Sequence, residues 1–210
     1  MMRMGVNPTR MELLRLRKRL TVARRGHKLL KDKLDGLVKE FLSIAKEYKR
    51  FRREVDEELP YALKLFVLAE ITSARPIIEN ALENTKQELK LEVRMRRVMS
   101  VPVPELEATF GKASGGYSLV HTPPELDQAI VGLRSFLPKL LKMAQLEEAV
   151  RRLADEIEKT RRRVNALEHT MIPRMVETVR FIAGKLDEIE RSNTSRLMKI
   201  KAQRMAQEGV

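Results

Sequence analysis

Apolar side chains recur along the first quarter of the chain in alternating steps of three and four residues. The series fills six successive heptads. Because a helix with about 3.6 residues per turn would let a straight stripe drift, a repeat held this long predicts a left-handed coiled-coil seam. The positions are Leu13, Leu16, Leu20, Ala23, His27, Leu30, Leu34, Leu37, Phe41, Ile44, Tyr48, Phe51 and Val55.

The start of this first helix is marked by two local signals. Pro8 follows Asn7 and suits the first helical turn. Thr9 and Glu12 have the S/T-x-x-E spacing of a capping box. Further along, Pro60 has no amide hydrogen for the helical ladder, so we expect a kink there with the helix continuing beyond it.

A second helical series begins at another capping-box spacing, Thr122-Pro-Pro-Glu125. Two successive steps of four residues join Met171, Met175 and Val179, which is a stutter that locally unwinds a supercoil. Pro173 lies inside the stutter, so we predict a kink at Pro173. The seam positions are Ile130, Leu133, Leu137, Leu140, Ala144, Leu146, Val150, Leu153, Ile157, Thr160, Val164, Leu167, Met171, Met175, Val179, Ile182, Leu186 and Ile189.

The segment between the two helices has the pattern of a small β-structure. Residues 89–96 alternate apolar and charged side chains, which is the period of a half-buried strand. Two prolines exclude a helix over residues 101–104, and the glycines of residues 111–116 predict a turn before the apolar stretch 117–120.

These patterns predict an all-α dominated fold: a long antiparallel two-helix left-handed coiled coil with a small β-hairpin insert between the helices. We divide the chain into an N-terminal long helix (1–73), a middle region with the hairpin (74–122) and a C-terminal long helix (123–210). With so short a connection the helices must double back, and aligning their ends places His27 opposite Met175.

Composition supports long helices with narrow seams. Aromatic residues make up 4% of the chain, tryptophan is absent, and charged residues reach 34%. The chain has no cysteine, and its three scattered histidines (His27, His121 and His169) do not suggest a zinc cluster. We therefore expect no metal, no cofactor and no disulfide, and the cytosol fits. No uncharged run approaches the length needed to span a bilayer.

Charge is distributed unevenly along the chain. Basic residues exceed acidic ones by 11 over residues 1–55 and by 5 over residues 127–210, whereas acidic residues are in excess by 3 between them. Basic ends are expected of nucleic-acid binders, of proteins on anionic lipid, and of shafts inside an acidic protein sleeve. A basic coiled-coil nucleic-acid-binding protein is the alternative function, although aromatics for base stacking are scarce.

Candidate chemistry is sparse. The carboxylates of residues 147–148 and 155–158 fit the solvated face of a heptad helix better than a catalytic pair. His27 fits a polar seam residue that specifies helix register better than a pH switch. Because no group of residues has the spacing of a catalytic site, an enzyme is not expected.

Four segments of the chain resemble a known family. They are Pro8–Leu14, Arg25–Lys33, Arg161–Glu168 and the pair Ile172-Pro173. In order and separation they closely resemble the signature segments of the D subunit of the archaeal (A-type) and vacuolar (V-type) rotary ATPases. The layout of long helix, small β-insert and long helix is also similar to that family.

The resemblance implies a central rotor axle without catalytic residues of its own. The implied partners are the catalytic hexamer of subunits A and B around the two termini, the F subunit on the coiled coil, and the C subunit as the socket above the membrane ring. The implied location is peripheral, on the cytoplasmic face of the membrane. Such an axle transmits torque between ring and hexamer, and so couples ATP synthesis or hydrolysis to proton or sodium transport.

Two sets of surface residues follow from this resemblance. Basic residues near the ends are expected to face acidic loops of the hexamer: Arg10, Arg15, Arg17, Lys18, Arg19, Arg191, Arg196 and Lys199. Apolar residues of the more acidic half are expected to contact the F and C subunits: Leu59, Leu65, Leu133 and Leu137. A kink at Pro173 would bow the axle and supply the asymmetry that a three-fold hexamer senses.

Overall fold

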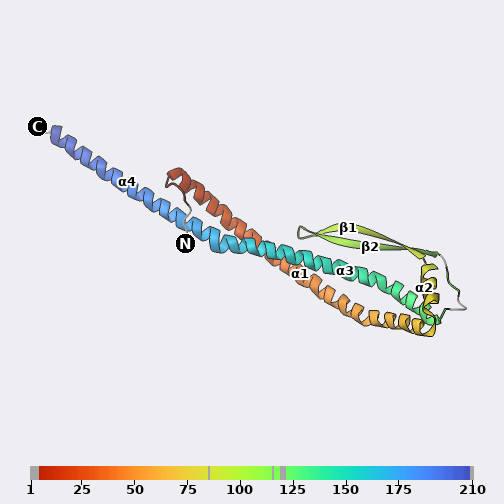
Figure 1. Ribbon diagram of the computed structural model, residues 1–210. Helices are drawn as coiled ribbons and strands as arrows, with labels where there is room; N and C mark the ends of the chain where they lie inside the picture. Colours follow the sequence, from red (N-terminus) through yellow and green to blue (C-terminus); the bar gives the residue numbers. More distant parts are fainter. Residues whose placement is uncertain (1–4, 85, 115, 119–121, 209–210) are drawn as a thin grey trace. The chain divides into compact units, whose positions relative to one another are not determined.

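The computed structural model describes residues 5–84, 86–114, 116–118 and 122–208. Figure 1 shows the elements in chain order: α1 (Arg10–Thr72), α2 (Arg75–Asn84), β1 (Lys86–Val98), β2 (Val101–Ser114), α3 (Pro124–Asn165), the π-helix η1 (Ala166–Met171) and α4 (Ile172–Glu208). The chain divides into two compact units. The terminal unit comprises Met1–Asp35 and Glu158–Val210, and the central unit comprises Gly36–Ile157.

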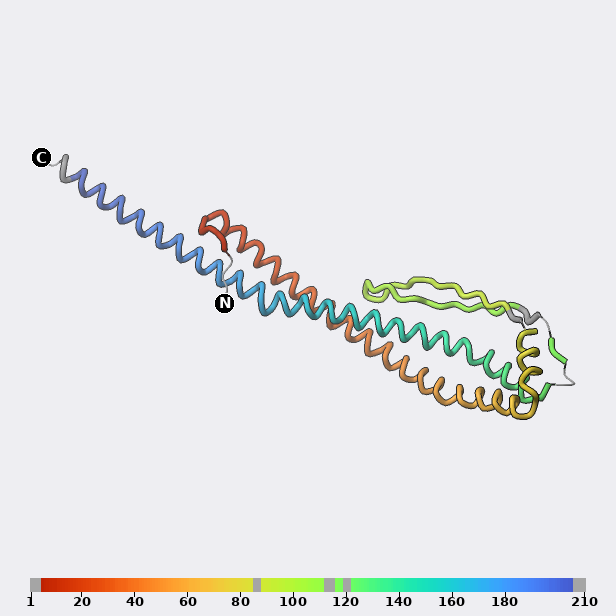
Figure 2. Tube along the Cα trace, viewed as in Figure 1, coloured from red at the N-terminus to blue at the C-terminus, as the bar shows by residue number. Residues whose placement is uncertain are grey.

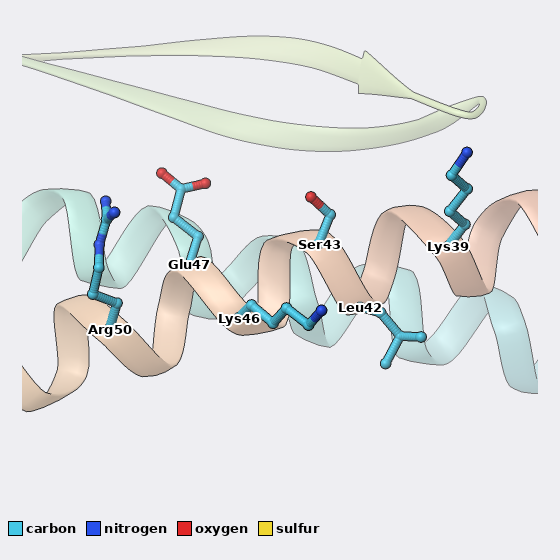
Figure 3. A pocket seen from close by; sticks show the side chains of 6 residues that line it. All are labelled: Lys39, Leu42, Ser43, Lys46, Glu47 and Arg50. Carbon is cyan, nitrogen blue, oxygen red and sulfur yellow. The ribbon is translucent and has the colours of Figure 1, made fainter.

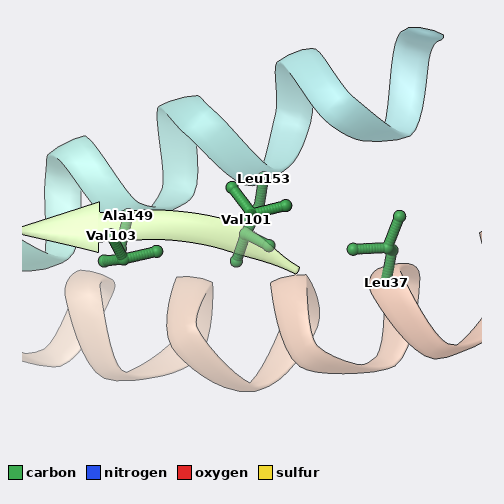
Figure 4. Packing of buried hydrophobic residues seen from close by; sticks show 5 residues of the cluster. All are labelled: Leu37, Val101, Val103, Ala149 and Leu153. Carbon is green, nitrogen blue, oxygen red and sulfur yellow. The ribbon is translucent and has the colours of Figure 1, made fainter. Parts of the chain in front are cut away.

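The core of the central unit joins three elements. Figure 4 shows Leu37 of α1, Val101 and Val103 of β2, and Ala149 and Leu153 of α3 converging on one another. Leu37 and Leu153 are completely buried. The hairpin is therefore held against the helix pair by the same apolar contacts that join the two helices.

Two further clusters continue the central unit. Val55 of α1 packs with Phe136 and Met143 of α3. Farther along α1, Ala69 packs with Leu126 at the start of α3. Because contacts of α1 move toward the start of α3 as the α1 residue number rises, the two helices run antiparallel.

The terminal unit repeats this antiparallel pairing. Leu16 is buried on α1, and Met175 and Ile182 are buried on α4. Arg10 at the start of α1 forms an ion pair with Glu190 of α4. The fold class predicted from the sequence is confirmed.

The seam positions expected on α1 are all buried or half-buried. On the second helical segment most are also covered, but Ala144, Met171 and Ile189 are exposed. Met171 is 43% exposed, so its placement in the seam was wrong. Near Ala144 the seam instead uses Met143, which is buried. Met171 is exposed because the helix type changes locally around it.

Residues 166–171 form a π-helix that ends two residues before Pro173, and the kink expected at Pro173 stays a prediction. The amide of Ile172 donates to the carbonyl of Leu167, five residues back, which is the π-helical spacing. A π-turn takes up one extra residue, and the 4–4 stutter contains one residue more than a regular heptad. Pro173 is the second residue of α4, and because η1 runs directly into α4, its missing amide hydrogen leaves a carbonyl of the preceding turn without that donor.

The helix starts differ in how they are capped. Thr9 accepts a hydrogen bond at Oγ1 from the Glu12 amide at 3.2 Å, as the capping box predicts. The expected cap at Thr122 is wrong, because no amide of α3 donates to its hydroxyl among the described residues; that hydroxyl instead donates to the Ser118 carbonyl at 2.8 Å. Pro60 lies inside α1, which continues to Thr72.

The hairpin is longer than predicted, and its turn lies elsewhere. β1 pairs antiparallel with β2 from Lys86 opposite Ser114 to Val98 opposite Val101. The turn is therefore Met99-Ser100, both with positive φ (48° and 73°). The turn predicted at residues 111–116 is wrong for residues 111–114, which belong to β2, and Gly115 lies outside the described residues. The two-residue period of β2 was hidden by its prolines. The short helix α2 was also not predicted.

Glycine at position 36 allows the hairpin tip to approach α1. A Cβ atom at Gly36 would collide with the terminal methyl of Met99. The tip of the hairpin thus contacts α1 where Gly36 leaves room for the flexible side chain of Met99.

Replacing Ser100 by glycine should stabilise the protein. A non-glycine residue at positive φ costs about 1 kcal/mol, and Ser100→Gly removes that cost. We expect the free energy of unfolding in urea to rise by about that amount. Ser43→Gly, in the exposed face of α1, is the matched control and should lower stability by about 0.5 kcal/mol. Equal effects of both changes would contradict the strained turn.

Candidate docking surfaces

The described residues do not contain the elements of a metal centre or a membrane span. No group of three or more His, Asp or Glu side chains among them is arranged to hold a metal ion. In the part of the chain that the structure describes, no helix is both apolar and long enough to cross a bilayer. His121 lies outside the described residues, and His169 is exposed.

One open hollow of about 700 Å³ lies along α1 in the central unit. Figure 3 shows the lining side chains, with Lys39, Ser43, Glu47 and Arg50 directed to the side of the helix where the hairpin lies. Lys46 adds a third cation. All of these side chains are exposed, so the hollow is a basic surface and not an enclosed binding site.

A more apolar surface lies at the end of α1. Pro60, Leu63, Val67 and Leu68 line a hollow of about 500 Å³ together with Lys64. Leu63, Val67 and Leu68 are each about half exposed. Unpaired apolar side chains on one helix face are typical of a protein interface.

The four apolar residues that we expected to contact the F and C subunits are not on this exposed surface, because they are partly covered within the helix pair. Leu59 packs against the cluster of Val55, Phe136 and Met143. Leu65, Leu133 and Leu137 are half-buried. Leu133 and Leu137 also belong to the predicted seam series, and their partial burial agrees with that series and not with an exposed docking face.

The last part of α4 has no partner helix in the terminal unit. Every described side chain from residue 191 to residue 205 is exposed. These include Leu197 and Met198, which are 66% and 68% exposed, and also Ile200 and Met205. Figure 2 shows the α4 tube continuing beyond the start of α1. The exposed apolar residues of this segment were not predicted, although apolar residues outside the heptad rhythm could have indicated them.

The basic residues expected at the ends are all exposed in the terminal unit. Arg10 forms an ion pair with Glu190. The Nη1 atom of Arg15 lies 3.7 Å from Oε2 of Glu12. Arg191, Arg196 and Lys199 share the unpartnered part of α4 with its exposed apolar side chains. The structure thus brings basic and apolar groups together on one helix.

His27 makes a polar contact across the helix pair of the terminal unit. Its Nε2 atom lies 3.2 Å from Oε2 of Glu168, within the π-helix. The hydrogen bond from His27 lowers the pKa of the Glu168 carboxyl below its ordinary value. This contact lies one heptad from Met175, the partner expected for His27.

The antiparallel coiled coil and its exposed apolar faces define a protein of the kind that docks onto other proteins. Comparison with known sequences then identifies the family. The sequence profile of the ATP synthase D subunit matches residues 12–202. The chain belongs to the family of ATP synthase D subunits.

Individual relatives are similar over nearly their full length. The chain is 50% identical to the V-type ATP synthase D subunit of Acetivibrio thermocellus, covering 94% of this chain and 91% of that protein. It is 46% identical to the protein of the same name from Fusobacterium nucleatum (96% and 97% covered) and 47% identical to that of Clostridium novyi (96% and 95%).

The His27–Glu168 contact predicts a specific acid response. A carboxyl whose folded pKa is depressed stabilises the fold above its unfolded pKa, about 4.3, and loses this contribution as the pH falls through the folded pKa. His27→Leu should therefore lose less stability than the original chain between about pH 5 and pH 3. Urea unfolding at both pH values measures the difference.

The matched control is His169→Leu, which removes an exposed neighbouring histidine but keeps the hydrogen bond. It should retain most of the acid response, since His169 lowers the pKa of Glu168 less than the hydrogen bond from His27 does. An unchanged acid response in His27→Leu would show that the contact contributes nothing to the fold.

Proposed function

We propose that this chain, by family a central-stalk subunit of an A/V-type ATP synthase, acts as the rotor axle of that complex. In this role it transmits torque between the ion-translocating ring in the membrane and the catalytic hexamer of subunits A and B. It couples ATP synthesis or hydrolysis to proton or sodium transport. The chain itself is non-catalytic, and the nucleotide chemistry belongs to the hexamer.

The observation that carries this proposal is the bare end of α4. A helix that is exposed on all sides over residues 191–205 and carries Leu197, Met198 and Ile200 needs an apolar environment from elsewhere. The inner surface of the hexamer would supply it. Arg191 and Arg196 would then meet acidic loops, and such charge contacts favour fast association while remaining screened by salt.

The central unit offers the surfaces for the remaining stalk partners. The half-exposed face of Leu63, Val67 and Leu68 on α1 supports a contact with the F subunit or with the C subunit of the socket. This face replaces the side chains first expected there, which are packed into the helix pair. The chain would therefore be held at the membrane through the complex, on its cytoplasmic face.

Torque transmission requires that the two helices resist separation. Each apolar side chain buried in the seam contributes about 1.5 to 3 kcal/mol, and buried residues recur from Leu16 to Ala69 on α1. The phase change at η1, next to Pro173, supports an asymmetric axle. Such an axle would favour a different conformation at each of three catalytic interfaces.

The experiment is a binding titration of the fluorescently labelled chain against the A and B hexamer. Leu197→Asp and Met198→Asp should each weaken binding at least about tenfold, because each removes about 1.5 kcal/mol or more of apolar burial. Both side chains are exposed in the free chain, so its stability should not change.

Val131→Asp is the control, since Val131 is 65% exposed but lies on α3 in the central unit. The Val131→Asp variant should bind the hexamer with the same affinity as the original chain. Failure of the original chain to bind the hexamer at moderate salt would contradict the axle role.

A further inference from the structure

Strand β1 is the exposed strand of the hairpin. Figure 1 shows β2 between β1 and α3 in the central unit. Every side chain of β1 from Glu88 to Arg97 is exposed, whereas most described side chains of β2 from Val101 to Gly111 are buried or half-buried. The two edges of the hairpin therefore have different surroundings.

The outer edge of β2 is occupied by side chains of α3. The amide of Leu106 donates to Oε1 of Gln145 at 3.4 Å, and the carbonyl of Pro102 accepts from Arg152 at 3.0 Å. In an antiparallel pair, facing residues alternate between pairs bonded to each other and pairs whose backbone groups point away. Leu106 and Pro102 belong to the pairs whose backbone groups point away from the partner strand.

The register of the hairpin shows which residues of β1 also point their backbone groups away from the hairpin. Leu106 faces Val93, and Pro102 faces Arg97. Val93 and Arg97 therefore direct their amide and carbonyl groups to the outer edge of β1, as do Leu89, Leu91 and Met95 by the same alternation. Among the described residues none forms a hydrogen bond with this edge.

Only one of the two edges is protected against pairing. Pro102 and Pro104 occupy outward positions of β2, where a missing amide hydrogen removes no bond of the hairpin and blocks an added strand. β1 contains no proline over Lys86–Val98, and its irregularity lies at its start, between Gln87 and Leu89. Of the devices that block edges in natural proteins, β1 has charged side chains and one irregularity near its start but no proline, so its backbone from Leu89 to Arg97 can still pair with a further strand.

The side chains along this edge provide an apolar surface. Leu89, Leu91, Val93 and Met95 occupy alternate positions and so share one face of β1. They are between 46% and 61% exposed. An incoming strand with apolar residues at alternate positions would extend this face and bury part of it.

Charged side chains of β1 near the turn indicate which side chains a neighbouring strand would carry there. Arg94 pairs with Glu92 and Glu107. Arg96 and Arg97 have no carboxylate within ion-pair distance among the described residues. A strand beside them is therefore complementary when it carries acidic side chains at the end near Met99-Ser100.

We propose that β1 accepts a β-strand from another subunit of the ATP synthase, which adds a third strand to the hairpin. The strand is apolar on the face shared with Leu89, Leu91 and Val93, and acidic beside Arg96 and Arg97. Backbone hydrogen bonds hold it, and the two side-chain patterns select it. This rests on the stalk role proposed above.

Hydrogen exchange compares the isolated chain with the same chain in the purified, assembled ATP synthase. Peptides covering residues 88–98 should exchange at least about tenfold more slowly after assembly. Peptides of β2, whose amides are bonded within the hairpin or to α3, should change less and serve as the internal reference.

Val93→Pro tests the backbone contact. It removes an outward amide but no hairpin bond, so it should abolish most of the added protection in the assembled complex. Val93→Thr is the matched control, because it keeps the amide and a strand-forming side chain, and it should retain that protection. A second variant, Arg96→Glu with Arg97→Glu, leaves the backbone intact and should also lose protection.

The outcomes separate this inference from the stalk role. If the chain assembles with the hexamer while residues 88–98 exchange as fast as in isolation, the strand contact is wrong and the stalk role stands. If the isolated chain already protects β1 in a dimer, the partner is a second copy and the inference is overturned. A chain that does not assemble contradicts both.

Discussion

The structure depends on apolar contact between two antiparallel helix segments. Leu16, Leu37, Leu153 and Ile182 are almost completely buried in a protein with few aromatic residues, so aliphatic packing provides most of the core. The hairpin joins this contact through Val101 and Val103, and so is positioned by the seam. Each docking surface is a part of a helix or strand that the seam leaves uncovered.

The sequence predicted the helix pair because a sustained heptad repeat indicates a continuous apolar seam between two helices. It did not predict the turn at Met99-Ser100, since neither residue is the glycine or asparagine that normally indicates positive φ. Pro102 and Pro104 concealed β2 because their compatibility with a strand depends on which edge faces outward. In the same part of α1, the sequence did not distinguish the exposed Leu63 from the covered Leu59 and Leu65, because periodicity identifies an apolar residue but not its partner.

The phase change in the second helix shows how one sequence signal permits two structures. A 4–4 step next to a proline is compatible with a kink or with a π-turn, and the chain adopts the π-turn at Ala166–Met171. The result leaves Met171 exposed and brings Glu168 to His27. A polar contact and an irregular helical turn therefore coincide within the apolar helix pairing of the terminal unit.

Antiparallel pairing is tested most directly by cross-linking, because the chain has no native cysteine. Glu58→Cys with Lys139→Cys replaces an ion pair of 2.6 Å between α1 and α3. A flexible bismaleimide of about 10 Å should join these two positions rapidly, whereas Glu58→Cys with Asp155→Cys should not react, since 16 residues of helix add about 24 Å. Preferential cross-linking of Glu58→Cys to Asp155→Cys would contradict the account.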